Sequence, residues 1–131
     1  MNIFNDEQSK KEEINLLPKI IEKFNINISL TKNMDRFDYE NKDFLIELKT
    51  RNNESNKYPT TIISTSKINY GLKIKKNMIF IFKFIDCIKY IEYDEKTFKN
   101  YENKYFKSRT DRGKDEYNYY TFIPIKDLIN F

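Results

Sequence analysis

The segment that most constrains the fold is residues 44–50, Phe-Leu-Ile-Glu-Leu-Lys-Thr, in which charged residues alternate with large apolar ones. Successive side chains of a β-strand point to opposite faces of the sheet, so this alternation predicts a strand. Glu47 and Lys49 then share one face, while Phe44 and Leu48 share the other. A carboxylate and an ammonium group thus become neighbours on an otherwise apolar strand.

This strand is predicted to be the second arm of a β-hairpin. Residues 36–39 form the first arm, and the polar Glu40-Asn41-Lys42-Asp43 separates the two arms. A turn of two or four residues pairs Tyr39 with Phe44. The hairpin would bring any acidic residue of the first arm close to the charged face of the second.

Two aspartates compete for that position. With an even-numbered turn, Asp38 lies on the face of Glu47 and diagonally across from it. A turn of odd length, or a β-bulge, would exchange the faces and favour Asp35 instead. The choice of Asp38 therefore depends on the length of the turn.

The rest of the chain predicts a mixed α/β fold. Residues 5–24 have helical periodicity, with apolar Ile14, Leu17, Ile21 and Phe24 at spacings of three and four. Further strands are expected at residues 26–30, 78–84, 88–93 and 119–125, further helices at 59–75 and 97–106, and a charged loop at 108–117. The order α-β-β-β-α-β, followed by an extension, argues for a mixed central sheet flanked by helices.

Length and composition narrow the class of protein. A chain of 131 residues is the size of one domain, and we expect a core at about residues 5–93 with an extension at about 94–131. The single cysteine, Cys87, fits a reducing intracellular setting. The longest apolar run, residues 78–91, is interrupted by charges, so we expect no membrane span and no membrane partner.

Several chemistries are excluded by composition. The chain has no histidine, which rules out Ser-His-Asp and Cys-His catalysis and zinc sites built from His and Cys. Only two glycines are present, too few for a phosphate-binding loop or a dinucleotide fingerprint. A net charge of +4 weakly favours a phosphate backbone as partner. The chain does have enough acidic residues for a cluster of carboxylates that holds Mg²⁺. Such a cluster can support cleavage of a phosphodiester.

Asp38 followed by Glu47-Leu48-Lys49 resembles the PD-(D/E)xK nuclease superfamily, whose restriction-endonuclease-like core has the same α-β-β-β-α-β order. The resemblance covers about the first two-thirds of the chain. It implies that Asp38, Glu47 and the backbone carbonyl of Leu48 bind Mg²⁺ or Mn²⁺, and that Lys49 activates water. Phe37 stands where the family pattern has proline, a position that varies. Residues 38–40, 47–51, 57–61 and 111–114 also look like small nuclease-like proteins of large DNA viruses and phages.

The same resemblance implies auxiliary residues in the two helices. Glu13 lies inside the apolar arc of the first helix and would point at the metal, unless it faces water in a frayed first turn. Ile63, Lys67, Tyr70 and Ile74 form a stripe on the second expected helix. Lys67, its only charge, would reach the scissile phosphate, unless it snorkels to solvent.

Basic and aromatic residues elsewhere are candidates for contacts with DNA. The candidates are Arg51, Lys57, Tyr58, Arg109, Arg112 and Lys114, although a solvated loop explains each of the charges equally well. Tyr58, Tyr117, Tyr119 and Tyr120 are candidates for stacking on unpaired bases, with structural packing as the alternative.

The sequence therefore predicts a metal-dependent nuclease that hydrolyses DNA phosphodiester bonds, as a structure-specific, resolvase-like enzyme or as an endonuclease. It would act inside the cell, in the host cell if the protein is viral, and as a monomer or a homodimer. One alternative is a catalytically inactive nucleic-acid-binding module that keeps the nuclease fold. Another is an interaction protein with no role on DNA, in which Glu47 and Lys49 form an ordinary surface ion pair.

Overall fold

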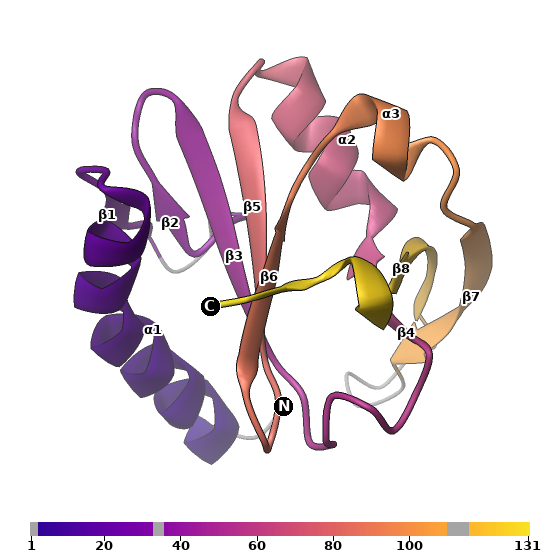
Figure 1. Ribbon diagram of the computed structural model, residues 1–131, viewed down its shortest axis with the longest axis horizontal. Coiled ribbons are helices and arrows are strands. Elements are labelled where there is room, and N and C mark those ends of the chain that lie inside the picture. The colour runs from indigo at the N-terminus through magenta and orange to yellow at the C-terminus, as the bar shows by residue number, and fades with distance from the viewer. Residues whose placement is uncertain (1–2, 33–35, 110–115) are drawn as a thin grey trace.

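The computed structural model describes residues 3–32, 36–109 and 116–131, which form a mixed α/β structure (Figure 1). In this part of the chain, six strands form a central mixed sheet in the order β1-β2-β3-β5-β6-β9, and three form an antiparallel sheet in the order β4-β8-β7. The helices are α1 (Ile3–Phe24), α2 (Thr65–Lys73) and α3 (Glu95–Phe98), with a short 3-10 turn at Ile125–Asp127. The strands are β1 (Ser29–Leu30), β2 (Tyr39–Glu40), β3 (Phe44–Thr50), β4 (Thr60–Ser64), β5 (Asn77–Lys83), β6 (Ile88–Glu92), β7 (Asn103–Arg109), β8 (Glu116–Pro124) and β9 (Ile129–Asn130).

The central sheet is covered on both faces. Helix α1 lies on one side, and α2, α3 and the three-stranded sheet lie on the other (Figure 1). On β5, Ile79 and Ile81 pack in the cluster that contains α1, whereas Phe80 and Phe82 pack in the cluster that contains α2. A strand buried on both faces is apolar at every position, which accounts for the continuous run Met-Ile-Phe-Ile-Phe. Strands β3 and β5 pair in parallel at the centre of the sheet.

Helix α1 presents a different face to the sheet from the one predicted. Leu16 and Ile20 are buried, whereas Ile14 is 50% exposed and Ile21 is 37% exposed. Leu17 and Phe24 are partly buried against the same cluster, as predicted. The stripe of α1 that packs against the sheet therefore begins at Glu13. It is displaced from the predicted stripe by about one residue around the helix. Periodicity alone could not choose between these two adjacent stripes, because both carry isoleucine and leucine.

The segment that follows Pro59 is a strand rather than the start of a helix. The structure places β4 at Thr60–Ser64, and α2 begins only at Thr65. Residues 60–63, Thr-Thr-Ile-Ile, are all β-branched, and β4 pairs with β8 over its whole length. Ile63 is buried from this strand and is not part of a helical stripe.

The expected helix at residues 97–106 is also wrong in most of its length. Helix α3 ends at Phe98, and Asp94 caps its first turn by accepting a hydrogen bond from the Thr97 amide at 3.0 Å. β7 follows and pairs with β8, which begins at Glu116 rather than at residue 119. Cross-strand aromatic pairs such as Phe106–Tyr120, with ring centroids 4.7 Å apart, favour the hairpin over a helix. Residues 110–115 of the expected charged loop lie outside the described residues.

The first hairpin keeps the predicted facing of its side chains but has a different register. β2 is only Tyr39–Glu40, and Tyr39 lies opposite Ile46 rather than Phe44. The side-chain oxygen of Asn41 accepts hydrogen bonds from the amides of Asp43 and Phe44 at 2.8 and 2.7 Å, which moves the four-residue turn to positions 41–44. The shift is two residues, an even number, so no side chain changes face.

A first prediction concerns the contact between α2 and β5. A Cβ atom added at Gly71 would lie 2.2 Å from the sulfur of Met78, whose side chain is almost fully buried. We expect Gly71→Ala to lower the free energy of unfolding by about 1–3 kcal/mol, because the overpacked core outweighs the gain in helix propensity. Urea denaturation of this variant and of Lys73→Ala, a change on the exposed part of the same helix, measures the difference. Equal or greater stability of Gly71→Ala would contradict the packing argument.

Candidate functional site

A polar cleft of about 390 Å³ opens just before the start of β2, beside the second half of β3. β2 pairs with β3 only at Leu45 and Ile46, so the later residues of β3 have no partner strand on that edge among the described residues. The cleft is lined by residues from α1, from the segment before β2, from β3 and its continuation, and from α2, namely Ser9, Glu13, Arg36, Asp38, Glu47, Leu48, Lys49, Thr50, Arg51 and Lys67. The gap in the sheet lets side chains from both sides meet.

Asp38 is held in place by the backbone of β3. Its amide donates to the Ile46 carbonyl at 3.1 Å, and its carboxylate oxygen Oδ2 accepts from the Leu48 amide at 2.8 Å. The side chain thus replaces a ladder hydrogen bond at the point where the strands separate. The structure therefore brings Asp38, rather than a residue on the opposite face, to the side of Glu47; Asp35 lies outside the described residues.

Glu47 is a buried carboxylate, only 3% exposed. Its atom Oε2 forms an ion pair with the Lys67 ammonium from α2, without the geometry of a hydrogen bond, and accepts no hydrogen bond from the described part of the chain. Burial raises the pKa of Glu47 above its usual value, and the neighbouring Asp38 raises it further. The charges of Lys49 and Lys67 act in the opposite direction.

Lys67 and Lys49 approach Glu47 from different elements. The Lys67 ammonium also donates to the carbonyl of Arg36, so α2 is tied to both strands of the hairpin region. Lys49 is partly buried, and this burial lowers its pKa, while the negative charge of Glu47 opposes the shift. Depressed lysine and raised carboxylate pKa values in one cleft are typical of functional sites.

Glu13 reaches the same cleft from α1. Burial raises its pKa, and so does the negative charge of Asp38, while Lys10 at 3.7 Å partly compensates. The hydroxyl of the buried Tyr39 donates to the Glu13 carbonyl at 2.7 Å, which fixes the helix against β2. The preceding Glu12 faces Thr50 and Lys83 and ties α1 to the ends of β3 and β5.

Arg51 lines the cleft, but its guanidinium group is engaged in the fold. It donates to the Thr61 hydroxyl at 3.1 Å and to the Ile62 carbonyl at 2.7 Å, and it lies over the Phe82 ring. Burial lowers its pKa. Arg51 therefore joins the continuation of β3 to β4, a role that the sequence did not indicate.

Of the other predicted DNA-binding residues, only Lys57 and Tyr58 have side chains in the part of the chain that the structure describes. Lys57 and Tyr58 are exposed and do not line the cleft. Arg112 and Lys114, as well as the side chain of Arg109, lie outside the described residues. Sequence reasoning missed Arg36 as a residue of the cleft, although its position two residues before Asp38 puts it on the same face of an extended segment.

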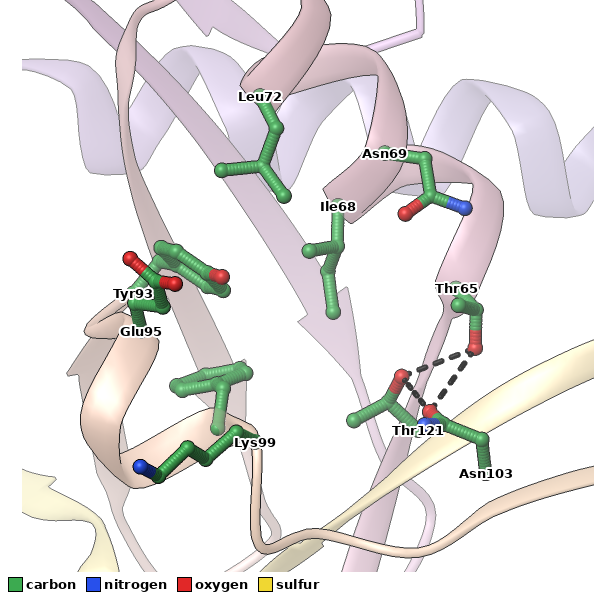
Figure 2. Close-up of a pocket in the computed structure, with 10 residues that line it drawn as sticks. Thr65, Ile68, Asn69, Leu72, Tyr93, Glu95, Lys99, Asn103 and Thr121 are labelled. Atoms are coloured by element: carbon green, nitrogen blue, oxygen red, sulfur yellow. Dashed lines mark hydrogen bonds between the residues drawn. The ribbon is translucent and has the colours of Figure 1, made fainter.

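A second hollow, of about 160 Å³, lies between α2, α3 and the three-stranded sheet (Figure 2). The apolar Ile68 and Leu72 form one side, while Thr65, Asn103 and Thr121 form a hydrogen-bonded group at the other (Figure 2). Glu95 is the only acidic residue that lines it among the described residues. This hollow has no cluster of carboxylates and is therefore a weaker candidate for chemistry.

Comparison with known families bears on the whole chain. A family described as "Phage putative PDDEXK endonuclease" matches residues 7–130. No curated protein and no solved structure gives a significant match. None of the described helices is long and apolar enough to cross a membrane. The match covers nearly the entire sequence and confirms the predicted nuclease family: the chain belongs to this PDDEXK endonuclease family of phages.

Proposed function

We propose that the protein is a metal-dependent endonuclease that hydrolyses DNA phosphodiester bonds in the cleft at the end of β3. The observation that carries the proposal is the convergence of Asp38, Glu47 and Lys49 on one polar cleft, with Glu13 and Lys67 beside them. Membership of a PDDEXK endonuclease family supports a nuclease independently of this geometry. The order α1-β1-β2-β3-α2-β5, with β4 inserted before α2, supports a restriction-endonuclease-like core within one domain.

Nucleases of this type use divalent metal ions, and the residues of the cleft fit such an ion. Among the described residues, no group of three or more His, Cys, Asp or Glu side chains has the arrangement of a ready-made metal site. However, the buried Oε2 of Glu47 lacks a hydrogen bond, and burial, together with the nearby Asp38 carboxylate, raises the pKa values of Glu13 and Glu47. A hard cation with a preference for oxygen ligands would offset both costs.

Asp38 and Glu47 would hold Mg²⁺ or Mn²⁺, with the Leu48 carbonyl as a further ligand and Glu13 as an auxiliary. When bound, the ion supplies neutralisation of charge on the phosphate and favours ionisation of water. Leu48 contributes its amide to the same arrangement, because that amide orients the Asp38 carboxylate. The Asp38 carboxylate is therefore positioned by a backbone group of the sheet rather than by a mobile side chain.

The two lysines would act on the phosphate and on water. Burial lowers the pKa of Lys49, which makes its ammonium a better proton donor. Lys49 would orient the attacking water and hold or move its proton. Lys67, on the other side of Glu47, would exchange its ion pair for a contact with the phosphate.

A catalytically inactive nucleic-acid-binding module remains the second candidate. One observation favours it: the Lys67 ammonium forms an ion pair with the buried oxygen Oε2 of Glu47, where a metal ion would otherwise bind. If that pair persisted in the presence of metal ions, Glu47 would serve only to hold α2 against the sheet.

We expect Lys49→Ala, Asp38→Asn and Glu47→Gln each to lower the rate of DNA cleavage by roughly 10²-fold or more, because each removes a group that acts on the reacting phosphate or water. The assay compares circular, linear, single-stranded and four-way-junction DNA with Mg²⁺ and with Mn²⁺. Cleavage of circular DNA identifies endonuclease action. Lys42→Ala, in the exposed turn of the same hairpin, is the matched control and should retain activity. If the wild type leaves all four substrates intact with either ion, the protein is not the proposed enzyme.

We also expect Lys67→Met to reveal the metal site through stability. Without metal, the change removes the cationic partner of a buried carboxylate and should lower the free energy of unfolding by about 1–3 kcal/mol, less than for a fully buried pair because Lys67 is 22% exposed. A divalent ion that binds Glu47 should restore part of this loss. Thermal unfolding with EDTA and with Mn²⁺ measures the effect, and Lys73→Met is the control. An equal loss of stability under both conditions would support the inactive module.

A further inference from the structure

Three tyrosines form an exposed aromatic surface on the hairpin of β7 and β8. Tyr105, Tyr117 and Tyr119 are 58%, 50% and 58% exposed. The ring of Tyr105 stacks with that of Tyr117 at 5.8 Å between centroids and lies 4.9 Å from that of Tyr119. We call these three residues the tyrosine surface. Tyr120, by contrast, points to the other face of the hairpin and packs on Phe106.

The tyrosine surface continues a face that is buried elsewhere. Strand alternation puts Tyr117 and Tyr119 on the same side of β8 as Thr121 and Ile123, which are almost fully buried. The hairpin extends beyond the core, so the face that packs against α2 at one end becomes exposed at the other. Single exposed aromatic side chains are common, but a cluster of them on the surface is typical of a binding site.

A hollow of about 210 Å³ lies between this surface and the first turns of α2. On the side of α2, its polar lining is supplied by Thr65, Ser66 and Asn69. Flat aromatic walls opposite hydroxyl and amide groups suit a flat, polar ring such as a nucleobase, which stacks on its faces and forms hydrogen bonds at its edges.

The position of the hairpin relative to α2 is fixed by hydrogen bonds. The hydroxyls of Thr65 and Thr121 lie 2.9 Å apart, and Thr121 donates to the side-chain oxygen of Asn103 at 2.6 Å (Figure 2). Thr65 belongs to α2, Thr121 to β8 and Asn103 to β7. The tyrosine surface and the first turn of α2 therefore form one rigid unit.

The same turn of α2 borders the catalytic cleft. Ser66 lines the hollow beside the tyrosines, whereas the next residue, Lys67, lines the cleft and contacts Glu47. A helix with its side chains is about 10–12 Å across, a distance that an unpaired strand spans with a few nucleotides. The exposed Lys107 lies on β7 opposite Tyr117 and adds positive charge for a phosphate backbone.

We infer that the tyrosine surface binds unpaired bases of a nucleic-acid strand whose backbone continues into the catalytic cleft. The inference rests on the proposed function and narrows it, because the preferred substrate would carry a single-stranded segment a few nucleotides from the scissile phosphate. The binding mode is stacking on Tyr105 and Tyr119, with little dependence on base identity.

The test uses the full-length chain in EDTA, so that binding is measured without cleavage. Its probes are a single-stranded DNA that contains 2-aminopurine and the fully paired duplex of the same sequence, and its readouts are fluorescence anisotropy and the quenching of 2-aminopurine by stacking. We expect Tyr105→Ala and Tyr119→Ala each to weaken single-strand binding by about 5- to 150-fold and to reduce the quenching. Tyr105→Phe and Tyr119→Phe, which keep the ring, should retain both. Ile85→Ala, at an exposed apolar residue that does not line the hollow, should behave as the wild type.

Several outcomes separate this inference from the proposed nuclease. Unchanged single-strand affinity and quenching in the two alanine variants would overturn it, whether or not the wild type cleaves DNA with metal. Equal losses in the phenylalanine and alanine variants would also overturn it, because stacking does not need the hydroxyl. Altered self-association with unchanged DNA binding would assign the surface to a protein partner and overturn it too. Loss of stacking in the alanine variants of a protein that does not cleave would support the surface and reject the nuclease.

Discussion

The burial of the Glu47 carboxylate on the central sheet is the constraint around which the cleft is built. A buried carboxylate without a partner costs several kcal/mol, so the fold must bring compensating charge to it. Lys67 supplies this charge from α2, and Lys49 supplies it from the next position on the same face of β3. The position of α2 relative to the sheet is therefore set in part by electrostatics and not only by apolar packing.

The cleft also depends on β2 being short. Because the ladder between β2 and β3 stops at Ile46, the Leu48 amide is available to the Asp38 side chain. A longer β2 would satisfy that amide with a backbone carbonyl and would close the gap through which Glu13 approaches from the other side of the sheet. At this site, regular backbone hydrogen bonds are lost and carboxylates are crowded together. Both lower the local stability, as is common at functional sites.

Helix α2 connects two surfaces of the molecule. One side of its first turn carries Lys67 into the cleft, and the other side, through Thr65, is hydrogen-bonded to the β7–β8 hairpin. β4 precedes this turn directly, and Arg51 joins the end of β3 to β4. Because these links are short and partly buried, the three-stranded sheet is held in a fixed position relative to the cleft.

The sequence by itself determined the features that depend on neighbouring residues. Alternation in residues 44–50 put Glu47 and Lys49 on one face, and an even-numbered turn kept Asp38 on that face even though the register differed by two residues. The resemblance to the nuclease superfamily was drawn from the same residues, and the family match over residues 7–130 shows the membership. Lys67 was identified as the one charge on a stripe, although part of that stripe, Ile63, belongs to a strand.

Only the tertiary structure decided the features that depend on distant pairing. β4 is a strand because it pairs with β8, which lies more than fifty residues later in the chain, and β7 is a strand because it pairs with β8 in a hairpin. In both segments this pairing overrides the local helical pattern. The choice between two apolar stripes of α1 depended on the shape of the sheet that receives it. The engagement of Arg51 by β4 and the exposure of three tyrosines beside α2 likewise follow from long-range packing, which sequence spacing does not encode.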